Sequence, residues 1–558
     1  MSKTSSVNFR VFLVVAVTTV AVIMCVYLFA VYKVLGIVFG CVLLAALLIL
    51  ATIVAIMFYR GKIKLRYLIA AVLSFCIGLS AFTVGAVTVD KWNKSAEIVG
   101  FRTVVGRVEC VDVRTGNYRI DLGKLQIDGK RVSGMLRLTI AKSDNNIGDY
   151  ARCGDIFRFN ANISSANILS GNRINGTAYR TNIRYYARVR SSDIEVEIGK
   201  PTVIENLLTS WRKLLTENMG DRYGNIAFSM VTGDKHALDS DVTDVFSAAG
   251  IGHIVAVSGL HIGFMALLLS FLLTRTDKRI KFSVTSAALI LYCIIADFSP
   301  SVVRATIMAE ISMLAVFFGG RRDIMSSLCC AFCLILAVKP LYLFEAGFLL
   351  SFGSIFGIAL FAGSIARFLK KHGAAQKIAD AIGSSVSVQI GATPAMIYIF
   401  NKISVFSLIV NVVLIPYISV VFIGIIVFSL IGAIPYLGVV LKAIEYLLMP
   451  IDYIATGIAA IPYSVIYISA TGAVFLCYPV MFFASGFFMM PRGKIAVVLA
   501  SIVACLSFCL ISLPKSVDTT PDDLIKTKSV VIADDYDVIP FYNYDCTTDF
   551  RLNERLRS

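Results

Sequence analysis

The sequence predicts an α-helical polytopic membrane protein, with about 13 transmembrane helices and one extracellular OB-like β-barrel domain inserted after the third span. Two observations lead to this prediction. Hydrophobic residues make up 57% of the 558 residues and charged residues only 16%, against roughly 25% in an ordinary soluble domain. The apolar residues also gather in runs of about 20, the length that a helix needs to cross a bilayer. This composition excludes a soluble enzyme, a disordered chain and a coiled coil.

The first three runs cover residues 11–32, 34–58 and 67–89. The first of them is too long for the apolar region of a signal peptide, and no small-residue cleavage site follows it. We therefore expect a retained span, and residues 1–90 are predicted to form a three-span membrane segment.

Residues 91–200 contain no apolar run longer than a few residues, and they are predicted to form the β domain. Five β-rich segments are separated by Gly, Asn and Asp: 104–113, 118–122, 131–140, 156–163 and 183–190. Five short strands suit a small barrel of the OB type. The domain holds 19 basic and 11 acidic side chains, a net charge of +8.

The second half of the chain is predicted to be the multi-span core. Residues 201–250 are amphipathic and are expected to lie at the membrane interface. Apolar runs resume within residues 251–513, at 252–274, 282–297, 301–319, 325–338, 342–363, 379–400, 404–433, 437–460, 467–490 and 494–513. Residues 514–558 form a short polar tail with 9 acidic and 6 basic side chains.

The charge of the loops sets the expected orientation. Four basic residues between positions 60 and 66 crowd one short loop, which the positive-inside rule places in the cytoplasm. The N-terminus is then cytoplasmic, and the β domain and the tail lie outside. Topology explains part of the overall charge of +16, but it does not require the +8 of the outside domain.

The outside domain has two interpretations. Basic strands with interleaved aromatic residues suit single-stranded nucleic acid, because bases stack on aromatic rings and phosphates bind cations. The alternative is a generic β module whose aromatics form its core and whose charges face solvent. The candidate DNA-binding residues are Arg102, Arg107, Lys130, Arg131, Arg158, Tyr179 and Arg184. Cys110 and Cys153 both flank strands, and a disulfide between them is one alternative in an oxidising exterior.

Three of the four histidines, His236, His253 and His261, lie within 26 residues. If the last two share one helix, they lie about 80° apart around it and about 12 Å along it, which is not a zinc-binding spacing. Ser258 lacks the nucleophile-elbow pattern, so a hydrolase ranks last. We predict no metal, no cofactor and no enzymatic activity on this chain. Polar groups at membrane depth instead favour the lining of a path.

Arg304, at the start of an apolar run, also has two interpretations. It is either a structural arginine that reaches toward the interface or part of a conduit, with an ion pair to Glu310 or Asp297 as one variant. Two later spans are predicted to break at polar residues and prolines, as the discontinuous helices of transport paths do. These residues are Gln389, Thr393 and Pro394 in one span and Asn411 and Pro416 in the other.

Four blocks resemble the signatures of the ComEC-type competence proteins, a family of DNA-uptake channels. They are Gly233 to His261, Ser299 to Ala305, Leu350 to Gly353, and Gln389 through Thr393-Pro394 to Asn411 and Pro416. Their order and spacing match the family, as does the order of three spans, an outside domain and a multi-span core, so the resemblance covers about residues 1–513. The core residues that it singles out are Gly233, Asp234, His253, Ser258, Gly259, His261, Arg304, Ser351, Gln389, Thr393, Pro394, Asn411 and Pro416.

The resemblance implies a channel that passes single-stranded DNA across the bacterial cytoplasmic membrane during natural transformation. The implied partners are DNA, the lipid bilayer, and receptor, nuclease and motor proteins supplied by other chains; a homo-oligomer is left open. Many members carry a metallo-β-lactamase-like domain at the C-terminus, and this sequence shows neither its metal motif nor a P-loop. The alternatives are a transporter or assembly factor for another anionic polymer or envelope component, and an inactive truncated copy.

Overall fold

The computed structural model describes residues 11–484. Within that range it leaves out residues 32, 61–64, 96, 115–116, 142–151, 167–168, 171–172, 175, 235–236, 256, 319–322, 435–436, 462–463, 469–473 and 475–476. The predicted span at 494–513 and the tail at 514–558 lie outside the described residues.

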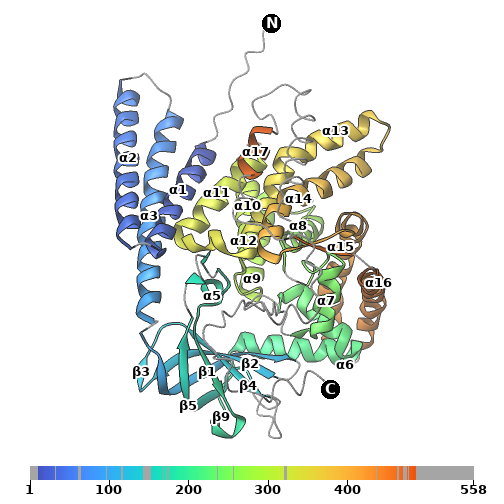
Figure 1. The fold of residues 1–558 in the computed structure, drawn as a ribbon. Coiled ribbons are helices and arrows are strands. Elements are labelled where there is room, and N and C mark those ends of the chain that lie inside the picture. The colour runs from blue at the N-terminus through green and yellow to red at the C-terminus, as the bar shows by residue number, and fades with distance from the viewer. Residues whose placement is uncertain are drawn as a thin grey trace, which may run out of the picture.

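Three long helices open the chain and pack against one another. They are α1 (Val11–Val31), α2 (Lys33–Tyr59) and α3 (Leu65–Ser95), shown in blue in Figure 1. The bounds of α1 and α2 match the predicted runs within one residue, whereas α3 continues past the predicted end at residue 89 into the range predicted for the β domain. α2 leaves much of its apolar surface exposed, as a helix against lipid does, while α1 also contacts a helix of the second half.

A closed five-stranded barrel follows α3, at the base of the molecule in Figure 1. Its strands are β1 (Gly100–Arg114), β2 (Asn117–Ile127), β4 (Met135–Ala141), β5 (Ile156–Ser165) and β8 (Ile183–Val189). They pair in the order β1-β2-β4-β8-β5, and β5 pairs back with β1 to close the ring. Only β4 and β8 run parallel. The sequence prediction of five strands forming a small barrel is confirmed.

Short elements decorate the barrel. They are β3 (Lys130–Arg131), β6 (Leu169–Ser170), β7 (Arg173–Ile174), α5 (Gly176–Thr181), a 3-10 turn at Ser191–Asp193 and β9 (Ile194–Glu197). Burial alternates along β5, as a strand with one face toward a core requires. The barrel therefore has its own hydrophobic core, separate from that of the helices.

The second half is almost wholly helical. Its helices are α6 (Val203–Thr232), α7 (Ser240–Ala248), α8 (Gly259–Leu272), α9 (Lys278–Ile295), α10 (Pro300–Phe317), α11 (Ile324–Val338), α12 (Ala346–Gly357), α13 (Gly363–Lys371), α14 (Gln376–Phe400), α15 (Ser407–Gly432), α16 (Lys442–Ala459) and α17 (Cys477–Ala484). Two 3-10 turns, Pro340–Phe344 and Gly438–Leu441, and a π-helical stretch, Ile358–Ala362, connect some of them. β10 (Lys402–Ser404) pairs with β11 (Val465–Tyr467).

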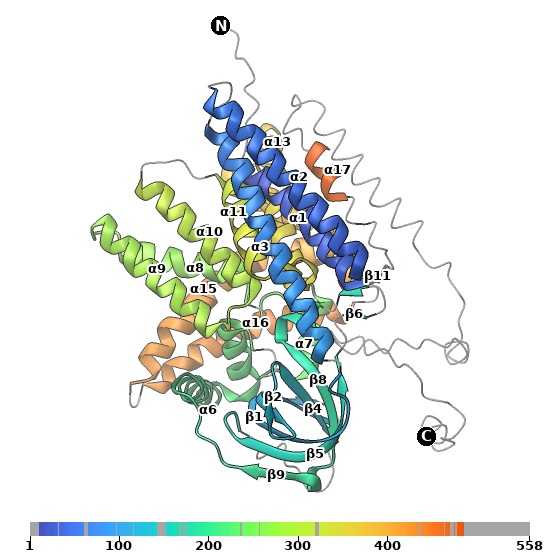
Figure 2. The same ribbon diagram turned by 90° about the vertical axis from the view of Figure 1, so that its left-hand side faces the viewer.

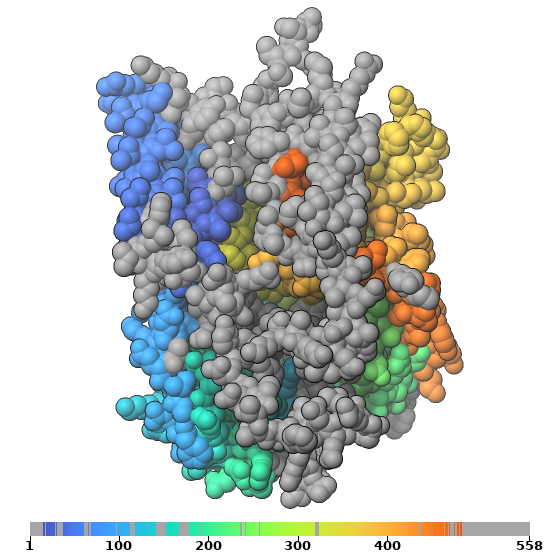
Figure 3. All heavy atoms as spheres, viewed as in Figure 1, coloured from blue at the N-terminus to red at the C-terminus, as the bar shows by residue number. Residues whose placement is uncertain are grey.

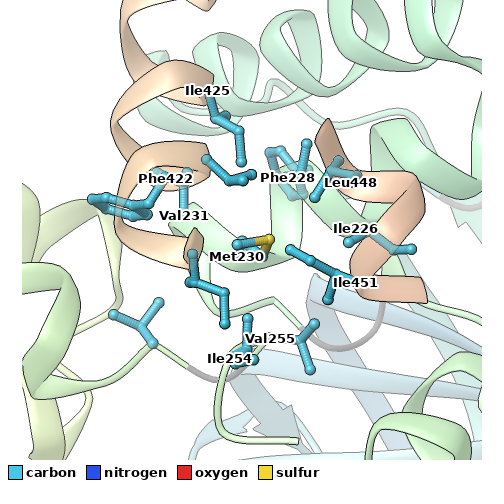
Figure 4. Packing of buried hydrophobic residues seen from close by; sticks show 14 of the residues in the cluster. Ile226, Phe228, Met230, Val231, Ile254, Val255, Phe422, Ile425, Leu448 and Ile451 are labelled. Atoms are coloured by element: carbon cyan, nitrogen blue, oxygen red, sulfur yellow. The ribbon is translucent and has the colours of Figure 1, made fainter. Parts of the chain in front are cut away.

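α6 lies across the base of the helices, between them and the barrel (Figures 1 and 2). A capping box begins it, because Thr202 and Glu205 exchange hydrogen bonds with each other's backbone. Its second half is buried against α15 and α16, and Figure 4 shows Met230 beside Ile451 and Phe228 beside Leu448. On the face shown in Figure 3, the N-terminal helices and the barrel lie on one side and the later helices on the other.

Within the described residues, six helical segments are long and apolar enough to cross a membrane. They are Gly40–Met57, Leu68–Ser95, Pro300–Phe317, Ala346–Lys371, Gln376–Phe400 and Ser407–Gly432. Three shorter apolar helices lie at Thr18–Tyr27, Gly259–Leu272 and Ile324–Val338. A polytopic membrane protein is therefore supported, and the larger number of about 13 spans stays a prediction. α16 is not among these segments, because its 18 residues include three charged side chains, Lys442, Glu445 and Asp452.

The predicted breaks at the two prolines are wrong. α14 continues through Pro394 and α15 continues through Pro416. A proline removes one helical hydrogen bond, and a membrane helix tolerates that loss where neighbouring groups satisfy the freed carbonyl and packing holds the flanking turns. Pro394 is buried, so the turns around it are held by the helices beside it.

Candidate functional site

The loop after α6 begins the candidate site. Gly233 ends α6 in the left-handed region (φ 78°), where a side chain is disfavoured, and its amide bonds to the carbonyl of Ser229 at 2.8 Å. The Ser229 hydroxyl donates to the carbonyl of Asp234 at 2.7 Å, which fixes the direction of the chain after the helix. A Cβ on Gly233 would lie 2.7 Å from a methyl carbon of Val257. Gly233 therefore allows this turn to pack against the segment that leads into α8.

Ser258 and His261 form the start of α8. Ser258 is the N-cap: its hydroxyl accepts from the amide of Leu260 at 3.3 Å, and its own amide donates to Nδ1 of His261 at 2.9 Å. The His261 side chain is 2% exposed and its ring stacks near Phe422, with centroids 4.6 Å apart. Both side chains are thus committed to the helix end and to packing, so a capping role explains their spacing.

His253 is not on this helix, because residues 252–255 form a turn and α8 begins at Gly259. The predicted angular separation of the two histidines is therefore wrong. Both rings line one small cavity of about 10 Å³, together with Ser258, Phe264 and side chains of α15. That volume holds about one water molecule. Among the described residues, no group of three or more His, Cys, Asp or Glu side chains could hold a metal ion.

Arg304 connects three helices. It lies on the second turn of α10 and is 4% exposed. Its Nε donates to the hydroxyl of Ser351 on α12 at 2.6 Å, and its guanidinium carbon lies 5.8 Å from the ring centroid of Phe352. A Cβ on Gly259 would lie 2.5 Å from Nη2 of Arg304, so the guanidinium reaches the first residue of α8. Arg304, Ser351 and Gly259, from three separate sequence blocks, therefore meet at one point.

No carboxylate pairs with Arg304 among the described residues. Glu310 instead accepts a hydrogen bond from Ser286 at 2.7 Å, and the sequence-based alternative of an ion pair with Glu310 or Asp297 is not seen. The remaining side-chain partner is Met308, whose sulfur lies 3.4 Å from Nη1. The positive charge of Arg304 is thus buried without a counter-ion from the described part of the chain.

Glycines bring the sequence block that begins at Gln389, on α14, against the block Leu350 to Gly353, on α12. A Cβ on Gly353 of α12 would lie 2.6 Å from the carbonyl oxygen of Gly391 on α14, and one on Gly383 would lie 3.0 Å from that of Ala362. Helices that approach this closely require small residues at the contact. On α14, the Thr393 hydroxyl donates to the carbonyl of Gln389 at 2.6 Å, so its hydrogen is used within its own helix.

Asn411 and Pro416 lie on α15, whose residues Ile415 and Ile418 line the histidine cavity. The Oδ1 of Asn411 is buried without a hydrogen bond from any described residue. The N-terminal turn of α15 packs on Gly250, where a Cβ would lie 2.9 Å from Cα of Ser407. These contacts bring the last block to the loop that carries His253.

The barrel candidates divide into two groups. Arg102, Lys130, Arg131 and Arg158 are exposed and stay candidates for DNA binding, and Arg102 also pairs with Asp128 at 3.2 Å. The other three, Arg107, Tyr179 and Arg184, are used within the chain. Most aromatic side chains on the barrel strands are buried, including Tyr118, Phe157, Phe159 and Tyr185, whereas Phe101 is 75% exposed. The aromatics therefore serve mainly as core, as the generic interpretation of the domain expected.

A junction between the barrel and the helices uses Arg184 and Tyr179. Arg184 lies 5.0 Å from the ring centroid of Trp92 at the end of α3, and donates to the hydroxyls of Ser95 (3.2 Å) and Ser133 (3.1 Å). Tyr179 of α5 meets the ring of Tyr342 edge-on, with centroids 5.7 Å apart. Trp92 donates to the carbonyl of Ala166 at 2.7 Å. The sequence around Trp92 gave no signal of this junction, because its partners come from distant segments.

Two ion pairs attach α6 on either side. Arg107 of β1 reaches Glu205 at 2.8 Å, and Arg222 of α6 binds Asp452 of α16 at 2.8 and 2.7 Å. Burial acts to raise the pKa of Glu205, but hydrogen bonds from Arg107 and Thr202 outweigh it and hold that pKa below its ordinary value. Charge alone could not identify these partners in the sequence.

Cys110 and Cys153 are not joined. Both are half-buried and neither forms a disulfide, so the alternative of a disulfide between them is not seen. Burial raises the pKa of the Cys153 thiol, and nearby carboxylates, Glu205 first, act in the same direction. Both effects disfavour the reactive thiolate.

Comparison with known proteins decides the family. The family model described as "Competence protein" matches residues 230–511, half of the chain. The chain belongs to the competence protein family. The resemblance found in the sequence is thereby confirmed, and all thirteen core residues of this competence protein fall within the matched region.

A curated relative agrees with that family. ComE operon protein 3 of Bacillus subtilis (strain 168) is 26% identical over 198 residues, which are 34% of this competence protein and 24% of the relative. The match thus spans about a quarter of the relative's length. No solved structure matches the chain.

Proposed function

We propose that this competence protein is the conduit through which single-stranded DNA crosses the bacterial cytoplasmic membrane in natural transformation. One observation carries the proposal. Where sequence blocks around Gly259, Arg304 and Ser351 converge, a buried guanidinium has no counter-ion among the described residues. Burying a charge costs several kcal/mol, and proteins ordinarily offset that cost with an opposite charge. A path for a polyanion supplies the opposite charge with its cargo.

The barrel is proposed to gather DNA before it enters the helices. Its exposed cations, among them Arg102, Arg131 and Arg158, would bind phosphates without regard to base sequence. We propose that the barrel lies outside the cell and the N-terminus in the cytoplasm, as the charge of the loops predicts. The junction through Trp92, Tyr179 and Arg184 would then hold the barrel in a fixed position above the entrance.

Energy and strand degradation are assigned to other proteins. A DNA receptor, a nuclease and a cytoplasmic motor or strand-trapping protein would act together with this chain. Membership of the competence family supports this division of labour, although the curated relative is matched over only 24% of its length.

A second function is favoured by the barrel's aromatics. Because Tyr118, Phe157 and Tyr185 are buried, they cannot stack on bases. A transporter or assembly factor for another anionic polymer or envelope component would need cations and no stacking rings. Competition between single-stranded DNA and other polyanions for the purified protein separates the two functions, since a DNA conduit binds DNA at least as well as any competitor.

The test of the first function is an uptake assay. The gene is deleted in a transformable host, and the entry of labelled DNA into a nuclease-protected state is measured, with binding of DNA to the cell surface as the control. We expect surface binding to persist and entry to be lost, and entry to return with the wild-type gene. Unchanged entry in the deletion strain contradicts the proposal.

A further inference from the structure

We infer that Arg304, Ser351 and the first turn of α8 form a binding site for one phosphodiester group. The inference rests on the proposed function and names what the site recognises: a negatively charged phosphate linkage, without contacts to a base. In a passing DNA strand, each linkage would occupy the site in turn.

The position of the guanidinium is fixed before a ligand arrives. Nε is held by the Ser351 hydroxyl at 2.6 Å, and the Phe352 ring lies beside the guanidinium plane at 5.8 Å from its carbon. Nη1 lies against the sulfur of Met308, a weak acceptor, at 3.4 Å. Nη2 has no acceptor among the described residues and is directed at Gly259. The arginine thus presents a donor toward the start of α8.

The start of α8 presents positive potential at the same place. The first amides of a helix lack partners within the helix, and the aligned peptide dipoles add roughly half a positive charge there. Ser258 satisfies the amide of Leu260, and that leaves the amide of Gly259, the first residue of the helix. A cation beside a helix N-terminus is repelled by it, and an anion that contacts both groups offsets this repulsion.

Glycine at position 259 lets the guanidinium approach the start of the helix. A Cβ there would lie 2.5 Å from Nη2 of Arg304 and 3.3 Å from Cβ of Ala305, so any larger residue would push the guanidinium away from the amide. An oxyanion with two equivalent oxygens fits such a pair of donors, one oxygen for the arginine and one for the amide. Phosphodiesters of DNA and of phospholipids share this chemistry.

The experiment measures thermal stabilisation of the full chain in maltoside micelles, which contain no phosphate. The probe is a thymidine dinucleotide with a single phosphodiester, compared with its uncharged methylphosphonate analogue; a separate arm adds phosphatidylglycerol. Four proteins are compared: wild type, Arg304→Gln, Gly259→Ala and the control Gly263→Ala. Gly263 lies on the same helix, and nothing lies within 4 Å of a Cβ there.

We expect the dinucleotide to stabilise the wild type and Gly263→Ala, with affinity lost roughly 10- to 100-fold in the other two variants, as for one charge-assisted hydrogen bond. The methylphosphonate should have no effect. Stabilisation by phosphatidylglycerol with the same variant dependence also supports a phosphodiester site and assigns its occupant to lipid.

Equal responses of all four proteins, or none from any, overturn the inference. Gly259→Ala retains the arginine, so the test stands even if Arg304→Gln does not fold. The uptake assay is separate from these measurements. If DNA entry is lost when the gene is deleted but is unchanged in Arg304→Gln and Gly259→Ala, this site is refuted and the proposed function stands.

Discussion

Replacing Gly353 by alanine tests the contact that joins α12 to α14. The new Cβ would lie 2.6 Å from the carbonyl oxygen of Gly391, about 0.7 Å closer than an ordinary C···O contact of about 3.3 Å. Both groups belong to helix backbones, so the helices must move apart rather than a side chain rotate. Overpacking of this kind costs about 1–3 kcal/mol, and the better helix propensity of alanine returns about 1 kcal/mol. We expect a net loss of up to about 2 kcal/mol in the free energy of unfolding.

The control is Gly363→Ala, which lies on the same stretch of helix. Gly363 is exposed, and nothing lies within 4 Å of a Cβ there, so only the gain in helix propensity remains. Thermal unfolding of both variants in detergent gives the comparison. Gly353→Ala should unfold at a lower temperature than the wild type and Gly363→Ala at an equal or higher one. If both variants gain stability alike, the two helices do not touch at Gly353, and the convergence of the third and fourth sequence blocks is refuted.

Three further predictions concern the barrel and α6. The pKa of Glu205 lies below its ordinary value, so its pairing with Arg107 stabilises the protein at pH values above the unfolded pKa of about 4.3, and this stabilisation is lost as the pH falls through the folded pKa. Glu205→Gln should therefore flatten the acid side of the curve of thermal stability against pH. An unchanged curve would show that the pair contributes nothing. Asp452→Ala removes the partner of Arg222 and leaves a half-buried cation without its hydrogen bonds, so the free energy of unfolding measured with a denaturant should fall by about 1–3 kcal/mol. A decrease no larger than that of a surface mutation would argue against the pair. Arg131→Gln should weaken the binding of single-stranded DNA. If the side chain contacts one phosphate, the slope of log binding constant against log salt concentration should become shallower by about 0.7. An identical slope would remove Arg131 from the DNA-binding surface.

The candidate site could be proposed from the sequence because its signals are local. Arg304 at the start of an apolar run and Ser258 near two histidines are visible from neighbouring residues, and four short blocks carry the family resemblance. The five strands of the barrel also follow from local alternation, since burial of one face of a strand requires every second residue to be apolar. The same local signals failed at the prolines, because whether a helix continues through a proline depends on the helices packed around it.

By itself, then, the sequence determined that the chain is a membrane protein with an inserted barrel, because hydropathy and strand alternation act over a few residues. Only the tertiary structure decided what those residues meet. It separated His253 from the helix of His261, buried the barrel aromatics, and placed Arg304 beside Gly259 without a carboxylate. These facts depend on contacts between segments tens or hundreds of residues apart, and such contacts leave no periodic trace along the chain.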